Sequence, residues 1–277
     1  EDLGGDLTPR SDITTQWTVE ADTPARARII DRRRGVIAGL DVACSVFNRV
    51  DAKLSLLRRA QDGDLVEVDD TILEISGSAA AILTAERTAL NFLQQLSGVA
   101  TLTRAYVDAI VGTQARITDT RKTVPGLRDL QKQAVRSGGG ISHRQGLFDA
   151  VLIKENHVTA AGGVTEAVRR ARLGAQGANR GSTRIMCEAE DLEQVCALVA
   201  GGPHLAPDRI LLDNMSPALM RQCVELARGA APAVELEATG NIDLTTVRAA
   251  AETGVDIISV GALTHSAPAL DLSLLFD

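Results

Sequence analysis

The sequence has few aromatic residues, no excess of positive charge and no long apolar run. Aromatic residues make up 2% of its 277 residues, and Asp plus Glu (36) exceed Lys plus Arg (29), giving a formal net charge of −7. Proteins that bind nucleic acid through basic surfaces and stacked aromatic rings have the opposite composition, so this class is disfavoured. No apolar run reaches the roughly 18 residues of a transmembrane helix, and no basic and apolar signal segment opens the chain at residues 1–5. We therefore expect a soluble protein.

Cysteine is also scarce. The four cysteines, Cys44, Cys187, Cys196 and Cys223, form no CxxC pair and have apolar neighbours. This pattern favours buried free thiols in a reducing compartment over disulfides or a zinc site, so we expect a cytoplasmic protein. With 45% hydrophobic residues, the chain can build one large domain or two modest ones.

The second part of the chain repeats a short β-rich run followed by an amphipathic or Ala-rich helix. The runs are residues 115–119, 150–154, 184–188, 209–213, 234–237 and 257–260. Their spacing of roughly 24 to 35 residues is typical of βα units with a parallel sheet. Six such units in a row indicate a barrel. Between them, Ser216 and Pro217 predict a helix start, and Pro125 is expected to open a helix that ends at Gly138.

The first part differs in pattern and predicts a smaller α+β unit. Candidate strands cover 25–30, 36–38, 65–68 and 72–75, and a long helix is expected over 79–96. We place the domain boundary near Gly98, which gives an N-terminal domain of residues 1–98 and a barrel domain of residues 99–266. The tail, 267–277, has an alternating pattern that suits packing on either domain, and we group it conditionally with the first.

Ionisable residues gather where the predicted barrel strands end. In a parallel barrel these ends converge on one face, where ligands bind. The residues are Asp119, Arg121, Lys122, Lys154, Glu155, Asn156, His157, Glu188, Glu190, Asp213, Asn214, Glu237, Thr239, Gly240, Asn241, Gly261 and His265. We therefore expect the functional site on this face.

A local excess of positive charge lies between residues 116 and 144, which hold seven Lys or Arg against two Asp. Arg128 and Lys132 fall inside a predicted helix and suit a solvated face. The turn residues Arg121, Lys122 and Arg144, with His143 and Lys154, suit a pocket for a small ligand with several negative charges, because guanidinium groups bind carboxylate or phosphate in bidentate fashion.

Two glycine clusters are candidate anion sites. Gly138 to Gly140 could bring backbone N–H groups to an anion, but a helix C-cap explains them equally well. Thr239, Gly240 and Asn241, with Gly261 one unit later, suit the phosphate site that barrels build from their last loops and helix N-termini. A plain turn is the alternative.

Glu188 and Asp213 end adjacent predicted strands, so their carboxylates can face one another. Two carboxylates without a His/Cys ligand set suit Mg²⁺, which completes its shell with water and substrate phosphates. The alternative is that each pairs with a barrel Lys or Arg. A positive pocket beside such a pair indicates a substrate that carries pyrophosphate.

Six motifs in order resemble one enzyme family over nearly the whole chain. They are ERTALNF (86–92), DTRKT (119–123), SGGGISHR (137–144), LIKENH (152–157), LLDNM (211–215) and SVGALTHS (259–266). The family is nicotinate-nucleotide pyrophosphorylase (carboxylating), also called quinolinate phosphoribosyltransferase.

The resemblance implies an α/β fold with an N-terminal α+β open-sandwich domain followed by an incomplete parallel α/β barrel. It also implies a homodimer whose active sites are completed by the partner's N-terminal domain. The implied reaction converts quinolinate and phosphoribosyl pyrophosphate to nicotinate mononucleotide, pyrophosphate and CO₂, with Mg²⁺, in NAD biosynthesis.

By this similarity, the site residues divide into two groups. The quinolinate carboxylates would be bound by Arg121, His143, Arg144 and Lys154, with Arg87 from the neighbouring subunit. Phosphoribosyl pyrophosphate and Mg²⁺ would be served by Lys122, Glu188 and Asp213, and the 5-phosphate by Thr239, Gly240, Asn241, Gly261 and His265. Lys122, Lys154, Glu188 and Asp213 are the predicted catalytic residues.

Three departures from the family pattern stand out. A helix of about twenty residues that usually precedes the first residues is missing, Met186 replaces the first Glu of a Glu-Val-Glu run, and Ala238 and Thr239 replace a common Ser-Ser. Three rivals remain open: a transferase of the same class with another acceptor, such as nicotinate; an enzyme that uses Lys154 as a Schiff-base lysine; and a non-catalytic phosphosugar-binding barrel.

Overall fold

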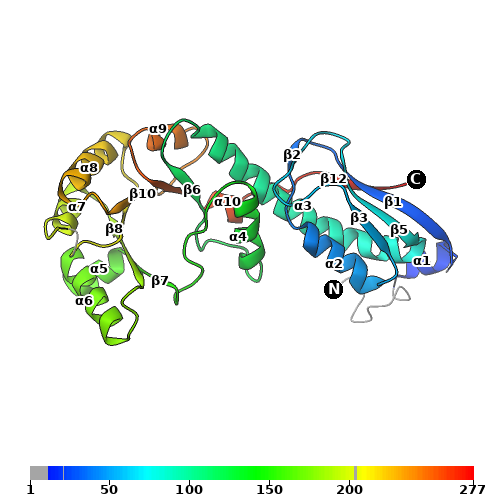
Figure 1. Ribbon diagram of the computed structural model, residues 1–277, viewed down its shortest axis with the longest axis horizontal. Helices are drawn as coiled ribbons and strands as arrows, with labels where there is room; N and C mark the ends of the chain where they lie inside the picture. Colours follow the sequence, from blue (N-terminus) through cyan, green and yellow to red (C-terminus); the bar gives the residue numbers. More distant parts are fainter. Residues whose placement is uncertain (1–11, 21, 203–204) are drawn as a thin grey trace. The chain divides into compact units, whose positions relative to one another are not determined.

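The computed structural model describes residues 12–20, 22–202 and 205–277 (Figure 1). The chain divides into two compact units. Unit 1 comprises residues 1–104, 129–139 and 266–277, and unit 2 comprises residues 105–128 and 140–265. Residues 1–5, where the sequence analysis found no signal segment, lie outside the described residues.

Unit 1 contains a four-stranded antiparallel sheet of order β12-β1-β5-β3 and a small β2-β4 pair. The strands are β1 (Pro24–Asp31), β2 (Gly35–Val36), β3 (Ser55–Arg58), β4 (Leu65–Val66), β5 (Thr71–Ser78) and β12 (Leu272–Phe276), and the helices include α1 (Ile13–Thr18) and α2 (Leu40–Val50). The sequence did not predict β3, whose half-exposed residues lack a strong apolar alternation. The tail pairs through β12 with β1.

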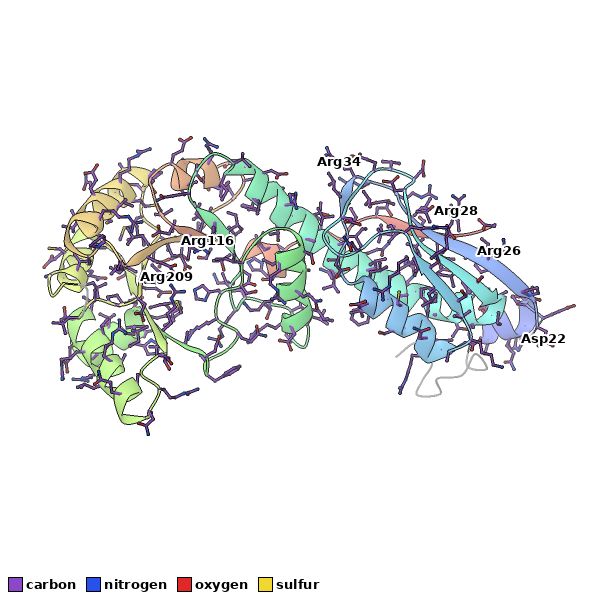
Figure 2. The ribbon with its side chains drawn as sticks, viewed as in Figure 1. Asp22, Arg26, Arg28, Arg34, Arg116 and Arg209 are labelled. Atoms are coloured by element: carbon purple, nitrogen blue, oxygen red, sulfur yellow. The ribbon has the colours of Figure 1, made fainter. Side chains whose placement is uncertain are left out.

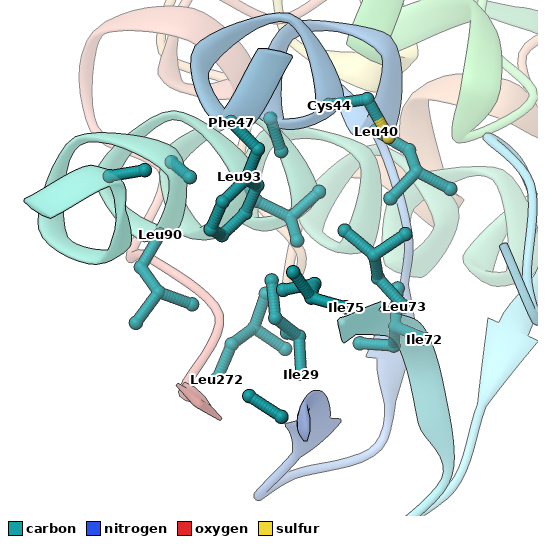
Figure 3. Packing of buried hydrophobic residues seen from close by; sticks show 14 of the residues in the cluster. Ile29, Leu40, Cys44, Phe47, Ile72, Leu73, Ile75, Leu90, Leu93 and Leu272 are labelled. Atoms are coloured by element: carbon teal, nitrogen blue, oxygen red, sulfur yellow. The ribbon is translucent and has the colours of Figure 1, made fainter. Parts of the chain in front are cut away.

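One apolar cluster holds unit 1 together. Figure 3 shows the side chains of Leu40, Cys44 and Phe47 on α2 facing residues of the sheet and of the long helix α3 (Ala79–Ala109). The spacing of the three residues along α2 places them on one helical face. Burial of such side chains contributes about 1.5–3 kcal/mol each, so this face fastens α2 to the sheet.

Helix α3 is longer than predicted, and Gly98, where we placed the domain boundary, lies inside it. The expected helix end at residue 96 is therefore wrong. A Cβ on Gly98 would come within 2.1 Å of the carbonyl oxygen of Pro268. The glycine lets the returning tail pass close to the helix, which explains its presence without a break in the helix.

Unit 2 contains a parallel six-stranded sheet of order β6-β11-β10-β9-β8-β7. The strands are β6 (Arg116–Thr118), β7 (Ala150–Ile153), β8 (Arg184–Ala189), β9 (Arg209–Asp213), β10 (Glu235–Thr239) and β11 (Ile257–Ser259). The helices α5 (Glu155–Ala161), α6 (Val164–Gly177), α7 (Leu192–Val199), α8 (Pro217–Ala230) and α9 (Val247–Ala251) lie outside the strands in Figure 1. Among the described residues β6 and β7 do not pair, so the barrel is incomplete, as the family resemblance implied.

Two helix starts test the capping predictions. Ser216 caps α8, since its side chain accepts a hydrogen bond from the backbone N–H of Leu219 and Pro217 is the first helical residue, as predicted. The prediction for Pro125 is wrong: Pro125 and Gly126 form a turn, and α4 begins only at Arg128 and ends at Ser137. Gly126 has φ +79, which a helix does not allow.

The glycines at 138–140 form the helix C-cap that was the alternative to an anion site. Gly138 and Gly139 donate their N–H groups to the carbonyl groups of Ala134 and Arg136, and Gly139 has φ +91. All four cysteines are free, but Cys196 is exposed, so the expectation of a buried thiol fails for that residue. Within the described residues, no helix is both long and apolar enough to cross a membrane.

Candidate active site

Many of the predicted barrel residues line one cavity of about 540 Å³ at the carboxyl ends of the strands of unit 2. It is lined by Thr120, Arg121, Lys122, His143, Arg144, Leu152, Lys154, Glu188, Leu211, Asp213, Asn214, Glu237, Thr239, Gly240, Asn241 and Ser259. The predicted residues outside its lining are Asp119, Glu155, Asn156, His157, Glu190, Gly261 and His265. The parallel register explains the convergence: Glu188 pairs with Leu211, and Thr239 pairs with Asp213. Because side chains alternate along a strand, Glu188, Asp213 and Thr239 share the inward face.

Arg121 and Arg144 bring two guanidinium groups to the lining of the cavity. The Nε atom of each guanidinium is buried without a hydrogen-bond partner among the described residues, whereas an Nη atom of Arg144 donates to the carbonyl oxygen of Ala150 at 3.1 Å. Burial, and next the positive charge of Arg121, lower the pKa of Arg144. An anion between the two guanidinium groups would satisfy their donors and relieve their repulsion.

Arg128 and Lys132 do not form the solvated face that the sequence predicted. Arg128 donates to the Thr123 hydroxyl at 3.0 Å and to the carbonyl oxygens of Gln145 and Arg121 at 3.2 and 3.3 Å. It therefore links the two turns that carry Arg121 and Arg144. Lys132 is 1% exposed. The prediction failed because helical position alone does not show which face a neighbouring turn covers.

Lys154 and Glu188 form an ion pair across neighbouring strand ends, with half of the Lys154 side chain exposed. For Glu188, the pairing with a barrel lysine that we kept as an alternative is therefore present. Asp213 accepts a hydrogen bond from the side-chain amide of Asn214 at 3.3 Å. The structure shows no group of three or more His, Cys, Asp or Glu arranged for a metal in the part of the chain that it describes. Two carboxylates fit Mg²⁺ only where substrate oxygens and water complete the shell.

The loops after β9 and β10 are locked together. Asn241 donates its side-chain amide to Oδ1 of Asn214 at 3.0 Å, and the backbone N–H of Asn214 donates to the carbonyl oxygen of Thr239. Gly240 has φ +89, and a Cβ there would lie 2.4 Å from Oδ1 of Asn214, so glycine is required. Because α9 begins only at Val247, this is a loop cradle and not the helix N-terminus we expected.

Gly261 and His265 lie beside Lys122. A Cβ on Gly261 would come 3.1 Å from Nε2 of His265 and 3.2 Å from Cδ of Lys122. The hydroxyl of Thr264 donates to the carbonyl oxygen of Lys122 at 2.7 Å. These contacts bring both predicted phosphate residues next to a lysine of the cavity.

Arg209 was not singled out from the sequence, and Glu237 was named among the strand-end residues without a role; the structure places Glu237 within β10, in the lining of the cavity. Glu237 is fully buried and contacts Nε2 of His143 at 3.5 Å and an Nη atom of Arg209 at 2.6 Å. Arg209 also binds Glu235. Burial alone would raise the pKa of Glu237, but the contacts with His143 and Arg209 outweigh it and hold the pKa below its usual value. Charged residues at alternate positions of β9 and β10 were the signal that could have found this pair.

Met186 has a clear place in the barrel. It packs with Ala150 and Leu211 in a small apolar cluster and is 2% exposed. The side chain at this position therefore makes apolar contacts in the barrel. Its neighbour Cys187 is no candidate nucleophile, because burial, and next Glu188, raise the pKa of its thiol to about 12. Arg87 lies on α3 in unit 1 and is exposed.

The parallel barrel and its cationic cavity define the class: an α/β-barrel protein whose site, at the carboxyl ends of the strands, suits a small substrate with several negative charges. Comparison with known proteins then identifies the family. Residues 12–97 match the model of the quinolinate phosphoribosyl transferase N-terminal domain, and residues 99–275 match that of its C-terminal domain. The chain belongs to the quinolinate phosphoribosyl transferase family, as the motifs predicted.

Individual relatives agree over the full length. The chain is 45% identical to the nicotinate-nucleotide pyrophosphorylase (carboxylating) of Mycobacterium leprae over 98% of this chain and 93% of that protein. It is 40% identical to the probable enzyme of that name from Bacillus subtilis over 99% of this chain and 89% of that one. The structure of the nicotinate-nucleotide pyrophosphorylase from Francisella tularensis matches with a TM-score of 0.88 at 41% identity, covering 96% and 90% of the two chains.

Proposed function

We propose that this protein converts quinolinate and phosphoribosyl pyrophosphate to nicotinate mononucleotide, pyrophosphate and CO₂, and so serves NAD biosynthesis. The observation that carries the proposal is the pair Arg121 and Arg144, whose buried guanidinium donors lack partners among the described residues of the cavity. Two carboxylates on one small ring match two such groups. The family membership supports the same reaction.

The acceptor subsite comprises the cations on one side of the cavity. Arg121 and Arg144 bind the two carboxylates of quinolinate, and His143 and Lys154 line the same region. Arg87 of the partner subunit completes the subsite in a homodimer. Fixing the ring through both carboxylates aims its nitrogen at the sugar, and orientation of this kind contributes several kcal/mol to catalysis.

The donor subsite comprises Lys122, Glu188 and Asp213 with the loop cradle. Glu188 and Asp213 would hold Mg²⁺, which supplies positive charge to the pyrophosphate. The 5-phosphate is bound by Thr239, Gly240, Asn241, Gly261 and His265. If Glu188 holds Mg²⁺, its ion pair with Lys154 would be broken, and Lys154 would be available to the acceptor.

The chemistry follows from these charges. The pyridine nitrogen forms a bond to C1 of the ribose while the bond to the pyrophosphate oxygen breaks and its electron pair leaves with pyrophosphate. Lys122 stabilises the departing negative charge. The bond from C2 of the ring to its carboxylate then breaks, CO₂ leaves, and the electron pair remains on the cationic ring. Lys154 stabilises this carbon until it takes a proton.

Shared active sites have a direct test. Two inactive variants, Arg87→Ala and Lys122→Ala, are mixed and allowed to exchange subunits. A homodimer with shared sites regains about a quarter of the activity in a 1:1 mixture, because half of the dimers are mixed and each holds one intact site. No recovery from exchanged dimers would show that Arg87 acts within its own chain or not at all. We also propose that the protein acts in the cytoplasm.

The reaction is tested with quinolinate labelled at its 2-carboxylate, Mg²⁺ and phosphoribosyl pyrophosphate, with nicotinate in a parallel tube. Labelled CO₂ and nicotinate mononucleotide formed together, from quinolinate alone, are the expected products. Nucleotide from nicotinate instead would assign a different acceptor. Borohydride trapping of a keto substrate on Lys154 is expected to fail, since this lysine is paired and half exposed and not desolvated.

A further inference from the structure

The carboxylate of Glu237 has an uneven set of contacts. Its Oε2 atom lies 2.6 Å from an Nη atom of Arg209 and 3.5 Å from Nε2 of His143, whereas Oε1 is buried without a partner among the described residues. A purely structural Arg–Glu pair would gain most from two parallel hydrogen bonds, and a buried acceptor left unsatisfied costs about 1–3 kcal/mol. Glu237 therefore lacks the second hydrogen bond of a parallel Arg–Glu pair, and its carboxylate contacts His143 instead.

His143 has a protein partner at each ring nitrogen. Nδ1 accepts the backbone N–H of Arg144 at 2.8 Å, and Nε2 faces Glu237. A nitrogen that accepts carries no proton, so the ring proton is on Nε2, directed at the carboxylate. The hydrogen bond at one ring nitrogen sets the proton at the other. The imidazole side chain is 6% exposed and lines the cavity.

The contacts form a chain from the base of the barrel to the anion site. Arg209, on β9, is shown in Figure 2 among the side chains of unit 2. It holds Glu237, Glu237 holds the ring of His143, and that ring receives the N–H of Arg144, whose guanidinium belongs to the acceptor subsite. The backbone N–H of His143 is itself held by Oδ1 of Asp119 at 2.9 Å.

We propose that Glu237 is a positioning residue for the acceptor subsite: through its contact with Nε2 it fixes the tautomer and orientation of His143, and through Nδ1 the place of Arg144. The inference rests on the proposed function for its kinetic consequence and on the geometry alone for its tautomer. Glu237 does not bind the substrate. Its loss affects the acceptor and leaves phosphoribosyl pyrophosphate unaffected.

The barrel provides a matched control. Glu235 lies two residues earlier on the same strand and also contacts Arg209, at 2.9 Å. Among the described residues, its ion pairs are with Arg116, Arg184 and Arg209, and not with His143. Glu235→Gln therefore alters the same arginine without touching the imidazole. Glu237→Asp keeps the charge that Arg209 needs and withdraws the carboxylate from the ring, which guards against a Glu237→Gln variant that fails to fold.

The test combines nitrogen NMR of ¹⁵N-histidine-labelled protein with steady-state kinetics. In the wild type, the His143 resonances, assigned with a His143→Gln variant, are expected to be pyridine-like for Nδ1 and pyrrole-like for Nε2. Glu237→Gln and Glu237→Asp are expected to mix the two tautomers and to raise KM for quinolinate about tenfold, with KM for phosphoribosyl pyrophosphate changed less than about twofold.

The outcomes separate cleanly. An unchanged His143 tautomer in the Glu237 variants, or equal effects from Glu235→Gln, would overturn the positioning role. A wild type that shows the predicted tautomer but forms no product from quinolinate would overturn the proposed reaction and leave the positioning of His143 standing. Equal increases in both KM values would show a general disturbance of the barrel and would also contradict the inference.

Discussion

The two ends of the barrel strands in unit 2 carry charge in opposite ways. At the amino ends, and reaching the middle of β10 through Glu237, lies the floor network, defined as Arg116, Arg184, Arg209, Glu235 and Glu237, in which each arginine contacts a carboxylate. At the carboxyl ends lie the mouth cations, defined as Arg121, Lys122, Arg144 and Lys154, which line the cavity. Each floor arginine is paired within the floor, where three arginines share two carboxylates. At the mouth, Lys154 is paired with Glu188, whereas Arg121 and Arg144 each have a buried Nε donor without a partner among the described residues.

The difference separates charges that are paired inside the fold from charges that are available to the proposed substrate. The floor includes Glu237, at 0% exposure, and Arg209, at 6%, so neither can lose its partner without leaving a buried charge. At the mouth, buried donors of Arg121 and Arg144 have no partner among the described residues, and the pKa of Arg144 is lowered by burial and by Arg121. The paired charges of the floor contribute to the stability of the fold. The unpaired donors of the mouth are available to bind an anion.

The largest expected effect is on the floor. Arg209→Ala removes the partner of the buried Glu237 and is expected to lower the free energy of unfolding by about 3–5 kcal/mol, measured by urea denaturation. Arg116→Gln is the control, because Arg116 contacts Glu235 at 3.5 Å with 55% of its side chain exposed. A pair this exposed contributes less than about 1 kcal/mol. Equal losses in both variants would break the comparison.

At the mouth the effect is on catalysis. Arg121→Ala is expected to lower kcat/KM for quinolinate about 100-fold, since it removes a charge-assisted contact to a carboxylate. The melting temperature is expected to stay within about 3 °C, because the Nε donor of Arg121 satisfies no other group among the described residues. Differential scanning calorimetry checks the second point. A loss of stability like that of a core deletion would move Arg121 from the mouth to the structural group.

The mouth cations were predictable from the sequence, and the pairings of the floor residues were not, although Glu237 itself was named. Strand ends carry their polar residues just after an apolar run, so Lys154, Glu188 and Asp213 stand out in the chain. Arg209 and Glu237 lie within strands, where the pattern does not say whether a charge faces solvent, a partner or the cavity. Pairing across strands decided their role, and it depends on the register between β9 and β10.

Similar reasons account for the misses elsewhere. The helix pattern predicted α3 but not its continuation past Gly98, because the tertiary contact with Pro268 that requires glycine lies far away in sequence. The chain pattern also placed Pro125 in a helix that a positive φ at Gly126 prevents. Local patterns predicted the elements, and long-range contacts decided their ends and the partners of their charges.

Asp31, in unit 1, differs from both the floor and the mouth. Its carboxylate is buried, lacks a full set of partners, and does not line the cavity. It is 0% exposed, its Oδ2 has no partner among the described residues, and burial raises its pKa from 3.8 to about 6. Because the folded state holds the proton more tightly than the unfolded state, this group favours folding more as the pH falls from about 6 towards 4, and its ionised form opposes folding above that range.

Asp31→Asn removes that penalty and sharpens the comparison. At pH 7.5 the variant is expected to be more stable by about 1–2 kcal/mol, and the gain is expected to disappear near pH 4. Urea denaturation across this pH range measures it. Asp69→Asn, at an exposed neighbour that pairs with Arg32, is the control and is expected to give no such gain. A loss of stability at pH 7.5 would mean that the Asp31 carboxylate is well compensated after all.

The smallest effect is expected where the same chemistry is exposed. Arg248 contacts Glu252 one helical turn later at 2.6 Å, as close as Arg209 contacts Glu237, but both side chains are 49% exposed. The order, with arginine before glutamate, is also the weaker one on a helix. Glu252→Gln is expected to cost only about 0.3 kcal/mol and nothing measurable in 1 M salt, where exposed charges are screened. A cost near that of Arg209→Ala would show that distance, and not burial, sets the value of an ion pair in this protein.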